Sequence, residues 1–235
     1  MVAFDTETGE IQWRAFDDPT STSSPVLFSL AASSGGALLP DVVFMTSLRL
    51  VAVNPLDGNV NWEFPMAFHP AGASPTPLVV DDQIITSTMT NGSTSIRLKS
   101  ENDKLTANQE WQEADLAGYF STGASSGDGK LFLITNALMP VPSAALRCVD
   151  LKSGKELWKK EGIGYFHAGI IRLGDGKLLI LDDSGLLRLA ETDEKGYHEL
   201  CTARICGGTL INPSFAEGRV FARDDKELVS VPLAP

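Results

Sequence analysis

Cysteine and histidine are scarce in this chain, and the few present do not form a metal-binding pattern. The 235 residues contain three cysteines and three histidines, namely Cys148, Cys201, Cys206, His69, His167 and His198. No Cys-x-x-Cys pair and no run of neighbouring His and Cys occurs, so the spacing indicates no zinc site. We expect the cysteines to serve as small buried apolar side chains and the chain to hold no metal.

Long apolar runs and an excess of positive charge are also missing. No run reaches the roughly 18 apolar residues that a membrane-spanning helix needs. Acidic Asp5 and Glu7 stand where a signal peptide would have its apolar segment, so we predict no direct insertion into a membrane. With 19 Lys and Arg against 30 Asp and Glu, the formal net charge is −11. Such a surface repels phosphate backbones, and we expect no nucleic-acid partner.

Helical periodicity and the familiar catalytic signatures are absent as well. No segment keeps an apolar period of 3.6 residues, and no GxSxG, HExxH, phosphate-binding or calcium-binding loop occurs. The Asp pairs (Asp81-Asp82, Asp182-Asp183 and Asp224-Asp225) stand at strand ends, where we expect them to cap turns. The remaining signals are 21 Gly, 13 Pro and short β-rich runs, which together predict an all-β fold.

Four tryptophans stand at a nearly constant interval. Trp13, Trp62, Trp111 and Trp158 are separated by 49, 49 and 47 residues. The phrases VAFDTETGEIQW, VAVNPLDGNVNW and LRCVDLKSGKELW end at the first, second and fourth of them. A fixed period of this length is typical of repeat architectures.

Each of these phrases has the same turn chemistry. An Asp or Asn lies eight residues before the tryptophan and a Gly four before it, as Asp5 and Gly9, Asn54 and Gly58, Asp150 and Gly154. Asp and Asn hydrogen-bond to the backbone that follows them, and Gly adopts the positive φ that reverses the chain. The copy at Trp111 has Ala107 in place of Gly, and in a fifth copy Leu200 takes the place of the tryptophan.

A second motif alternates with the first. The β-rich runs LFLITN, LLILDD and VFARDD follow tight-turn signals, and short strands with Ser or Pro precede them. Each unit of about 47 residues therefore has four short strands, which is a β-propeller blade. We predict a single propeller domain over residues 1–235, with about five blades visible. The repeats cover residues 1–13 (partial), 14–62, 63–111, 112–158, 159–200 and 201–235, with each tryptophan packed between adjacent blades.

The two ends of the chain leave two interpretations open. The last repeat has three strands, and the opening phrase could supply its fourth, which would close a five-bladed ring and remove exposed sheet edges. Alternatively, the chain is an incomplete piece of a longer propeller.

The three repeated phrases resemble the pyrroloquinoline-quinone (PQQ) repeat of the quinoprotein alcohol dehydrogenase-like propellers. The resemblance implies rings of seven or eight blades, which favours the incomplete propeller, and a periplasmic or extracellular location. Enzymes of this superfamily hold PQQ and a calcium or lanthanide ion, and many carry adjacent cysteines. No two cysteines are adjacent here, and no catalytic residue can be matched to this chain.

We therefore favour a non-catalytic propeller that binds a protein partner or a ligand. The alternatives are a PQQ- and calcium-dependent quinoprotein oxidoreductase, or a fragment without a function of its own, and a homodimer through open blade edges is conceivable. Ligands of propellers bind where the innermost strands begin, which selects six candidates for the central channel: Ser74, Thr76, Tyr119, Ser121, His167 and Asn212. His167 is the strongest polar outlier, although a hydrogen bond to a neighbouring blade would also explain it. Tyr165, Phe166 and Tyr119 could form an aromatic rim or belong to the core.

Overall fold

A computed structural model describes residues 1–29, 40–66, 75–101, 104–137 and 141–233. Among these, the regular elements are β-strands and one short 3-10 helix, η2 (Ala114–Leu116). The first strands form a hairpin of β1 (Val2–Phe4) and β2 (Ile11–Arg14). Ser74, one of the predicted channel residues, lies outside the described residues.

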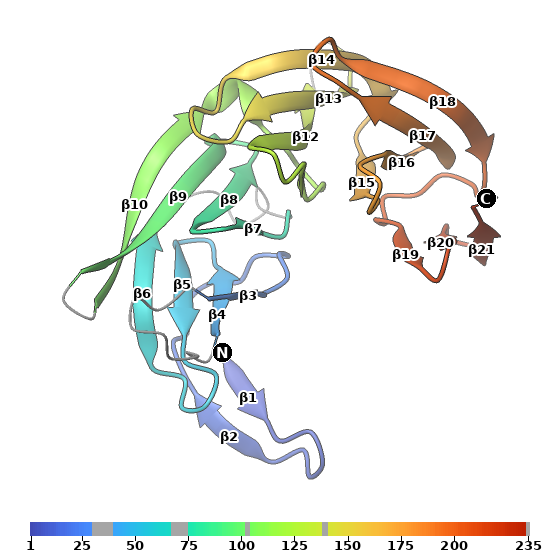
Figure 1. Cartoon of the computed structure of the whole chain (residues 1–235). Coiled ribbons are helices and arrows are strands. Elements are labelled where there is room, and N and C mark those ends of the chain that lie inside the picture. The colour runs from blue at the N-terminus through green and yellow to red at the C-terminus, as the bar shows by residue number, and fades with distance from the viewer. Residues whose placement is uncertain (30–39, 67–74, 102–103, 138–140, 234–235) are drawn as a thin grey trace. The chain divides into compact units, whose positions relative to one another are not determined.

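Four four-stranded antiparallel sheets and one three-stranded sheet follow the hairpin (Figure 1). The first contains β3 (Val26–Phe28), β4 (Asp41–Met45), β5 (Arg49–Val53) and β6 (Val60–Pro65), and the second β7 (Leu78–Val80), β8 (Gln83–Thr88), β9 (Gly92–Glu101) and β10 (Lys104–Glu113). The third contains β11 (Ala124–Ser125), β12 (Lys130–Ala137), β13 (Ser143–Asp150) and β14 (Glu156–Gly164).

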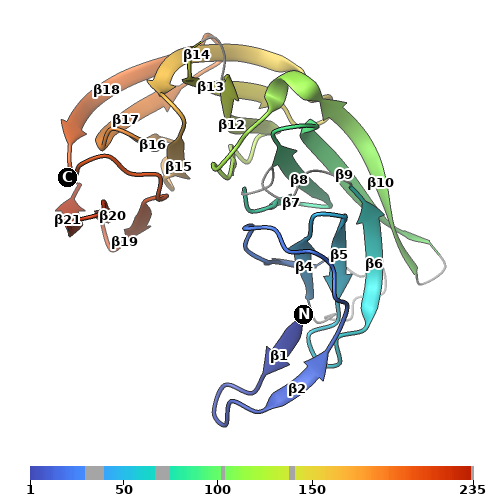
Figure 2. The same ribbon diagram turned by 180° about the vertical axis from the view of Figure 1, so that it is seen from behind.

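A further four-stranded sheet precedes the three-stranded one. It contains β15 (Ala168–Arg172), β16 (Leu178–Asp182), β17 (Leu186–Thr192) and β18 (Tyr197–Arg204), and the last sheet contains β19 (Ser214–Ala216), β20 (Arg219–Arg223) and β21 (Leu228–Pro232). In all, four sheets have four strands, one has three, and the opening hairpin has two. The order of strands within each sheet follows the chain, as Figure 2 shows from behind. Each sheet is therefore an antiparallel meander, the topology of a propeller blade.

The chain divides into two compact units, residues Met1–Gln112 and Glu113–Pro235. Unit 1 contains the hairpin and the β3–β6 and β7–β10 sheets; its core joins Phe28, Leu50 and Trp62 to Ile84 and Ile96 of the next sheet. Face-to-face packing of neighbouring sheets thus provides the apolar core of this unit.

In unit 2 one strand supplies side chains to two cores. Leu178 and Ile180 of β16 pack with residues of the β11–β14 sheet. Leu179 and Leu181 point the other way and pack with the β19–β21 sheet. All four side chains are fully or almost fully buried. Successive side chains of a strand point to opposite faces of the sheet, so this unbroken apolar run buries both faces. The β15–β18 sheet therefore packs between two others.

Two of the tryptophans contact the turn of the following sheet. Trp13 donates from Nε1 to the carbonyl oxygen of Pro55 at 2.9 Å, and its ring lies directly over Gly58. Trp158 donates to the carbonyl oxygen of Asp193 at 3.2 Å. Trp62 differs, because its Nε1 donates to Asp41 Oδ2 at 3.1 Å within its own sheet. In the next sheet, the residue four before Trp111 is Ala107, which lies within β10.

The strand register corrects one sequence-based assignment. A bulge precedes Trp13, Trp62 and Trp158, so that Trp62 pairs with Ala52 and Trp158 with Cys148. In the β15–β18 sheet the same bulge places Cys201, opposite Leu189, at the tryptophan position. Leu200 is instead the bulged residue, 47 % exposed and equivalent to Leu157 at 49 %.

The prediction that all three cysteines are buried is therefore wrong for Cys201. Its thiol is free and its side chain exposed, whereas Cys148 and Cys206 are free and buried. Burial raises the pKa of Cys148 to about 11, so this thiol stays protonated at neutral pH.

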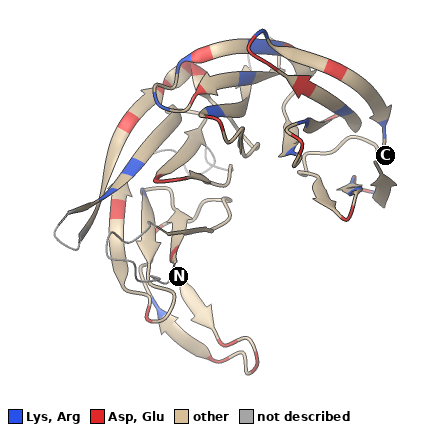
Figure 3. Cartoon of the chain, in the orientation of Figure 1, with Lys and Arg blue, Asp and Glu red and all other residues tan. Residues whose placement is uncertain are grey.

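A cross-strand ion pair recurs between the third and fourth strands of the sheets. The pairs are Arg49–Glu63, Arg97–Glu110, Arg147–Glu156 and Arg188–Glu199. Figure 3 shows both signs of charge on these strands. Each such partly exposed pair is worth at most about 1 kcal/mol, so the pairs favour the register of the strands more than they add stability.

Candidate functional site

The described channel candidates all lie just before the first strand of a sheet. Thr76 is half-buried ahead of β7 in unit 1. The other four belong to unit 2, where Tyr119 and Ser121 precede β11, His167 precedes β15 and Asn212 precedes β19. Ser121 and His167 are in contact. Asn212 is exposed and lies against Gly169 of β15.

Polar side chains at the ends of the second strands hold these entry loops in unit 2. Asn136 Oδ1 accepts a hydrogen bond from the Tyr119 amide at 3.0 Å. Asp183 accepts from the amides of Tyr165 at 3.0 Å and Phe166 at 2.6 Å. Asp224 does the same for the Gly207 amide at 2.6 Å. Each inner loop is therefore fixed by the second strand of its own sheet.

Further hydrogen bonds connect the three loops to one another. Asn136 Nδ2 donates to the carbonyl oxygen of Phe166 at 2.7 Å. The Asp183 amide donates to the carbonyl oxygen of His167, and the Thr209 amide donates to the carbonyl oxygen of Asp183, both at 3.1 Å. The loops ahead of β11, β15 and β19 thus form one continuous surface, which we call the loop face of unit 2.

His167 lies beneath this loop face. Its side chain is 1 % exposed, and its Nδ1 lies 3.1 Å from Ser121 Oγ. The ring of Phe120 meets the imidazole edge-on, with centroids 6.3 Å apart. His167 Nε2 is buried and has no hydrogen-bond partner among the described residues. Burial lowers the pKa of His167 to about 4, and the negative charge of Asp183 opposes this only in part, so the ring is neutral at pH 7.

The Asp pairs in unit 2 act as turn caps. Asp182 accepts hydrogen bonds from the Ser184 amide at 2.9 Å and from Ser184 Oγ at 2.6 Å, and it forms an ion pair with Arg188 at 2.7 Å. Burial alone would raise the pKa of Asp182, but these bonds outweigh it and keep the pKa below its usual value. Asp224 likewise accepts from the amides of Lys226 and Glu227.

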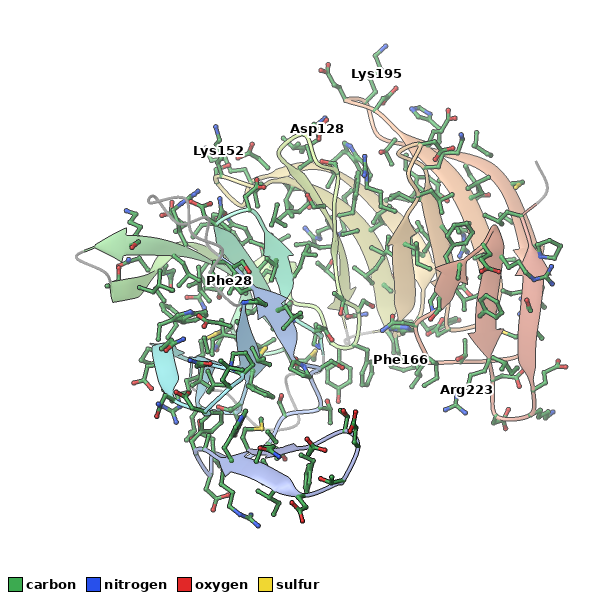
Figure 4. All side chains as sticks on the ribbon, turned by 60° about the horizontal axis from the view of Figure 1, so that its bottom comes forward. Phe28, Asp128, Lys152, Phe166, Lys195 and Arg223 are labelled. Carbon is green, nitrogen blue, oxygen red and sulfur yellow. The ribbon has the colours of Figure 1, made fainter. Side chains whose placement is uncertain are left out.

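Apolar side chains project from the loop face. Tyr165 is 62 % exposed and Phe166 43 %. Val141 ahead of β13 is also exposed, as are Leu210 and Ile211 ahead of β19. Figure 4 places Phe166 and Arg223 at the edge of unit 2 opposite Asp128, Lys152 and Lys195. The aromatic residues therefore form part of an exposed surface and not of the core.

A cavity opens beside Tyr165. Its volume is about 430 Å³, and the residues that line it are Val141, Pro142, Ser143, Gly162, Gly164, Tyr165, Asp182, Asp183 and Ser184. The space is large enough for one or two side chains of a partner.

The sequence could have indicated some of these residues but not others. Val141 and Leu210 belong to no pattern that distinguishes them. Asn136, Asp183 and Asp224 could have been found, because polar residues stand at the ends of the runs LFLITN, LLILDD and VFARDD.

The described residues contain neither a cluster of metal ligands nor a membrane-spanning helix. No cluster of three or more His, Cys, Asp or Glu side chains could hold a metal ion within the described ranges. In the same ranges, no helix has the length and apolar character to cross a membrane.

Replacing Ser121 by alanine is expected to destabilise the chain by about 1–3 kcal/mol. The change leaves His167 Nδ1 buried without a partner, in addition to Nε2, and an unpaired buried polar atom costs that much. Thermal unfolding measures the loss as a lower melting temperature, at about 2–4 °C per kcal/mol. The control is Ser214→Ala at an exposed site, expected to change stability by less than about 0.5 kcal/mol; equal effects of the two changes would contradict the role of the Ser121–His167 contact.

Comparison with known families gives one match. Residues 1–160 match the family model described as "Outer membrane protein assembly factor BamB". Among curated proteins, none matches the chain.

Solved structures of low sequence identity share the fold. BamB from Moraxella catarrhalis is 13% identical with a TM-score of 0.53, and the match covers 98% of this chain and 77% of that one. Quinohemoprotein alcohol dehydrogenase from Comamonas testosteroni is 13% identical with a TM-score of 0.63, covering 94% of this chain and 51% of that one. The enzyme ADHIIG from Pseudomonas putida HK5 is 10% identical with a TM-score of 0.57, covering 93% and 40%. The chain spans about half the length or less of the two dehydrogenases, and the likeness shows an all-β, propeller-like fold of several blades.

Proposed function

This chain belongs to the PQQ-like repeat family whose model describes the assembly factor BamB, and from that membership we propose that it is a non-catalytic propeller that binds a protein partner through the loop face of unit 2. The observation that carries the proposal is the group of exposed apolar residues on loops that hydrogen bonds hold in place. Exposed apolar side chains that gather on one face mark interaction sites.

Fixed loops favour binding for an entropic reason. The backbone of Tyr165 and Phe166 is held by Asp183 and Asn136 before any partner arrives, so little conformational entropy is lost on association. Tyr and Phe are also enriched at the centres of interfaces. The cavity beside Tyr165 would receive a side chain of the partner.

The family also supports a location. The matched description names outer-membrane assembly, and we propose that this chain acts in the periplasm or outside the cell. We further propose that it works without PQQ or calcium. A homodimer through the edge strands β1 and β21 is a separate possibility, which sedimentation of the purified chain would test.

Affinity measurements with a reconstituted partner test the proposed function. A protein that co-purifies with the chain from its own cells would be expressed separately and titrated against wild type, Phe166→Asp and Leu56→Asp. Leu56 is 70 % exposed in a turn of unit 1 and serves as the matched control. We expect Phe166→Asp to weaken binding by at least about tenfold, the effect of a residue at the centre of an interface, and Leu56→Asp to change it less than about twofold.

Two results would contradict the proposal. One is equal binding by wild type and Phe166→Asp. The other is stoichiometric uptake of PQQ in the presence of calcium, measured by visible absorption, together with dye-linked oxidation of an alcohol or sugar. The second result would assign the chain to the quinoprotein oxidoreductases.

A further inference from the structure

His167 is a buried group that partner binding does not use. The imidazole is 1 % exposed, and only Nδ1 has a hydrogen-bond partner, Ser121 Oγ. Nε2 has none among the described residues. The carbonyl oxygen of His167 accepts from the Asp183 amide. The residue therefore joins the loop ahead of β11 to the turn after β16 (Asp182–Gly185).

Protonation increases the number of N–H donors on the imidazole that need an acceptor. The neutral ring has one N–H and one unprotonated nitrogen, whereas the protonated ring has an N–H at both positions. Ser121 can accept from Nδ1, but no acceptor among the described residues faces Nε2. A buried charge without a partner is strongly disfavoured, so the imidazolium forms readily only after the ring has left its buried place.

The surrounding charges do not offset this cost. The charge of Asp183 acts on the ring, but both oxygens of this carboxylate already accept from the amides of Tyr165 and Phe166. Asp182 is paired with Arg188. The titratable groups of the loops around the ring are the phenols of Tyr119 and Tyr165, and Asn136 at the end of β12 is neutral. The low pKa of His167, about 4 as a result of burial, agrees with this geometry.

We propose that His167 is an acid-sensitive latch of the loop face: when the imidazole takes up a proton from solvent, the segment Tyr165–His167 detaches from Ser121 and Asp183, the face loses its shape, and a bound partner is released. The latch stands on the geometry of unit 2 alone. Its last step, partner release, rests on the proposed function.

The expected pH dependence follows from one proton. An exposed histidine titrates near a pKa of about 6.5, so the open state binds a proton below that pH and the closed state does not until about pH 4. Between these values the closed loop face becomes less stable as the pH falls, and the ratio of open to closed molecules rises by up to about tenfold per pH unit.

Hydrogen exchange tests the latch without a partner. The readout is the protection factor of the Asp183 amide, which donates to the carbonyl oxygen of His167, corrected for intrinsic exchange. We expect it to fall about tenfold per pH unit between pH 6 and pH 4.5, in keeping with the uptake of one proton, with no such slope in His167→Gln. His198→Gln removes an exposed histidine and should keep the wild-type slope. A flat wild-type profile, or the same slope in His167→Gln, would overturn the proposal.

Two further measurements remove ambiguity. If His167→Gln does not fold, an NMR titration of the wild-type imidazole decides: a closed-state pKa below about 5 supports the latch, and an ordinary value overturns it. With the reconstituted partner, Kd should rise by the factor by which the closed fraction of the loop face falls, because only the closed face binds. A constant Kd at a pH at which hydrogen exchange shows the face mostly open would overturn the release step. If the protection factor of the Asp183 amide falls steeply with pH but the loop face binds no protein, the proposed function would be wrong and the acid-sensitive latch would still hold.

Discussion

Gly185→Ala is expected to abolish the native packing of unit 2, with a loss of about 4–5 kcal/mol or more. Gly185 has a φ of +83°, and an added Cβ would lie 2.2 Å from the carbonyl oxygen of Cys206 and 2.4 Å from that of Gly207. Both contacts are with backbone, which cannot rotate away as a side chain can. Relief requires the 205–207 loop to move, which breaks the Gly207–Asp224 hydrogen bond. A loss of this size is exceptional for a single substitution.

The matched control for this change is Gly176→Ala. Gly176 has a similar φ of +90°, but an added Cβ would meet only Arg172 Nη2, at 4.0 Å. The left-handed conformation alone costs about 1–2 kcal/mol, which corresponds to roughly 2–8 °C in melting temperature for a chain of this size. Thermal unfolding of the two variants gives the comparison. Equal melting temperatures would show that the 205–207 loop does not pack on Gly185 as described.

Gly58→Ala is expected to release the β1–β2 hairpin from the β3–β6 sheet. An added Cβ would lie 2.6 Å from Cε3 and 2.8 Å from Cδ2 of Trp13, so the indole must move and lose its hydrogen bond to Pro55. An isolated two-stranded hairpin is marginal in water. We expect a loss of about 3 kcal/mol, from the φ of +73° and the lost contact together. Trypsin cleavage after Arg14 should accelerate correspondingly.

Gly9→Ala supplies the control for the hairpin. Gly9 has a φ of +72°, and its amide donates to the carbonyl oxygen of Asp5 as that of Gly58 does to Asn54, but nothing lies within 4 Å of an added Cβ. Only the conformational cost of about 1–2 kcal/mol is expected there. In a double-mutant cycle, Trp13→Ala should remove most of the excess cost of Gly58→Ala. An unchanged excess in the Trp13→Ala background would mean that the clash does not involve the indole.

The repeated turns were predictable because their chemistry is local. Asp5 accepts from the amides of Glu7 and Thr8, and Asp150 from that of Ser153. These contacts span two or three residues, so composition and spacing suffice to predict them. The four-stranded sheets follow from the same spacing, because a hairpin turn fixes which strands pair.

The exact register could not be derived from spacing alone. Leu200 lies four residues after Gly196, as Trp13, Trp62 and Trp158 do after their glycines, yet Cys201 occupies the tryptophan position. The turn in that sheet is two residues shorter: the Asp193 amide donates to the Gly196 carbonyl oxygen, three residues on, whereas the Asp150 amide donates to that of Lys155, five residues on. In a β-strand, a shift of one residue reverses which side chain faces the core. Only the pairing of β17 with β18 reveals it.

The loop face could be predicted only in part. The position of His167 and Ser121 ahead of first strands was visible, because strand order is regular. Their hydrogen bond spans 46 residues, and the links through Asn136 and Asp183 also join separate sheets or loops. Such contacts depend on how neighbouring sheets pack, and single-sequence patterns contain no direct record of that packing.

Site-specific photocrosslinking in the cells that encode the chain tests the central claim most directly. Benzoylphenylalanine would replace Phe166 or Leu210 on the loop face, and Leu56 or Leu157 as exposed controls elsewhere. We expect the two loop-face positions to capture the same protein and the two control positions to capture none of it. Mass spectrometry would identify this protein, and a binding assay would then show that it binds the purified chain. Capture of that protein from Leu56 or Leu157, with none from Phe166 and Leu210, would contradict it.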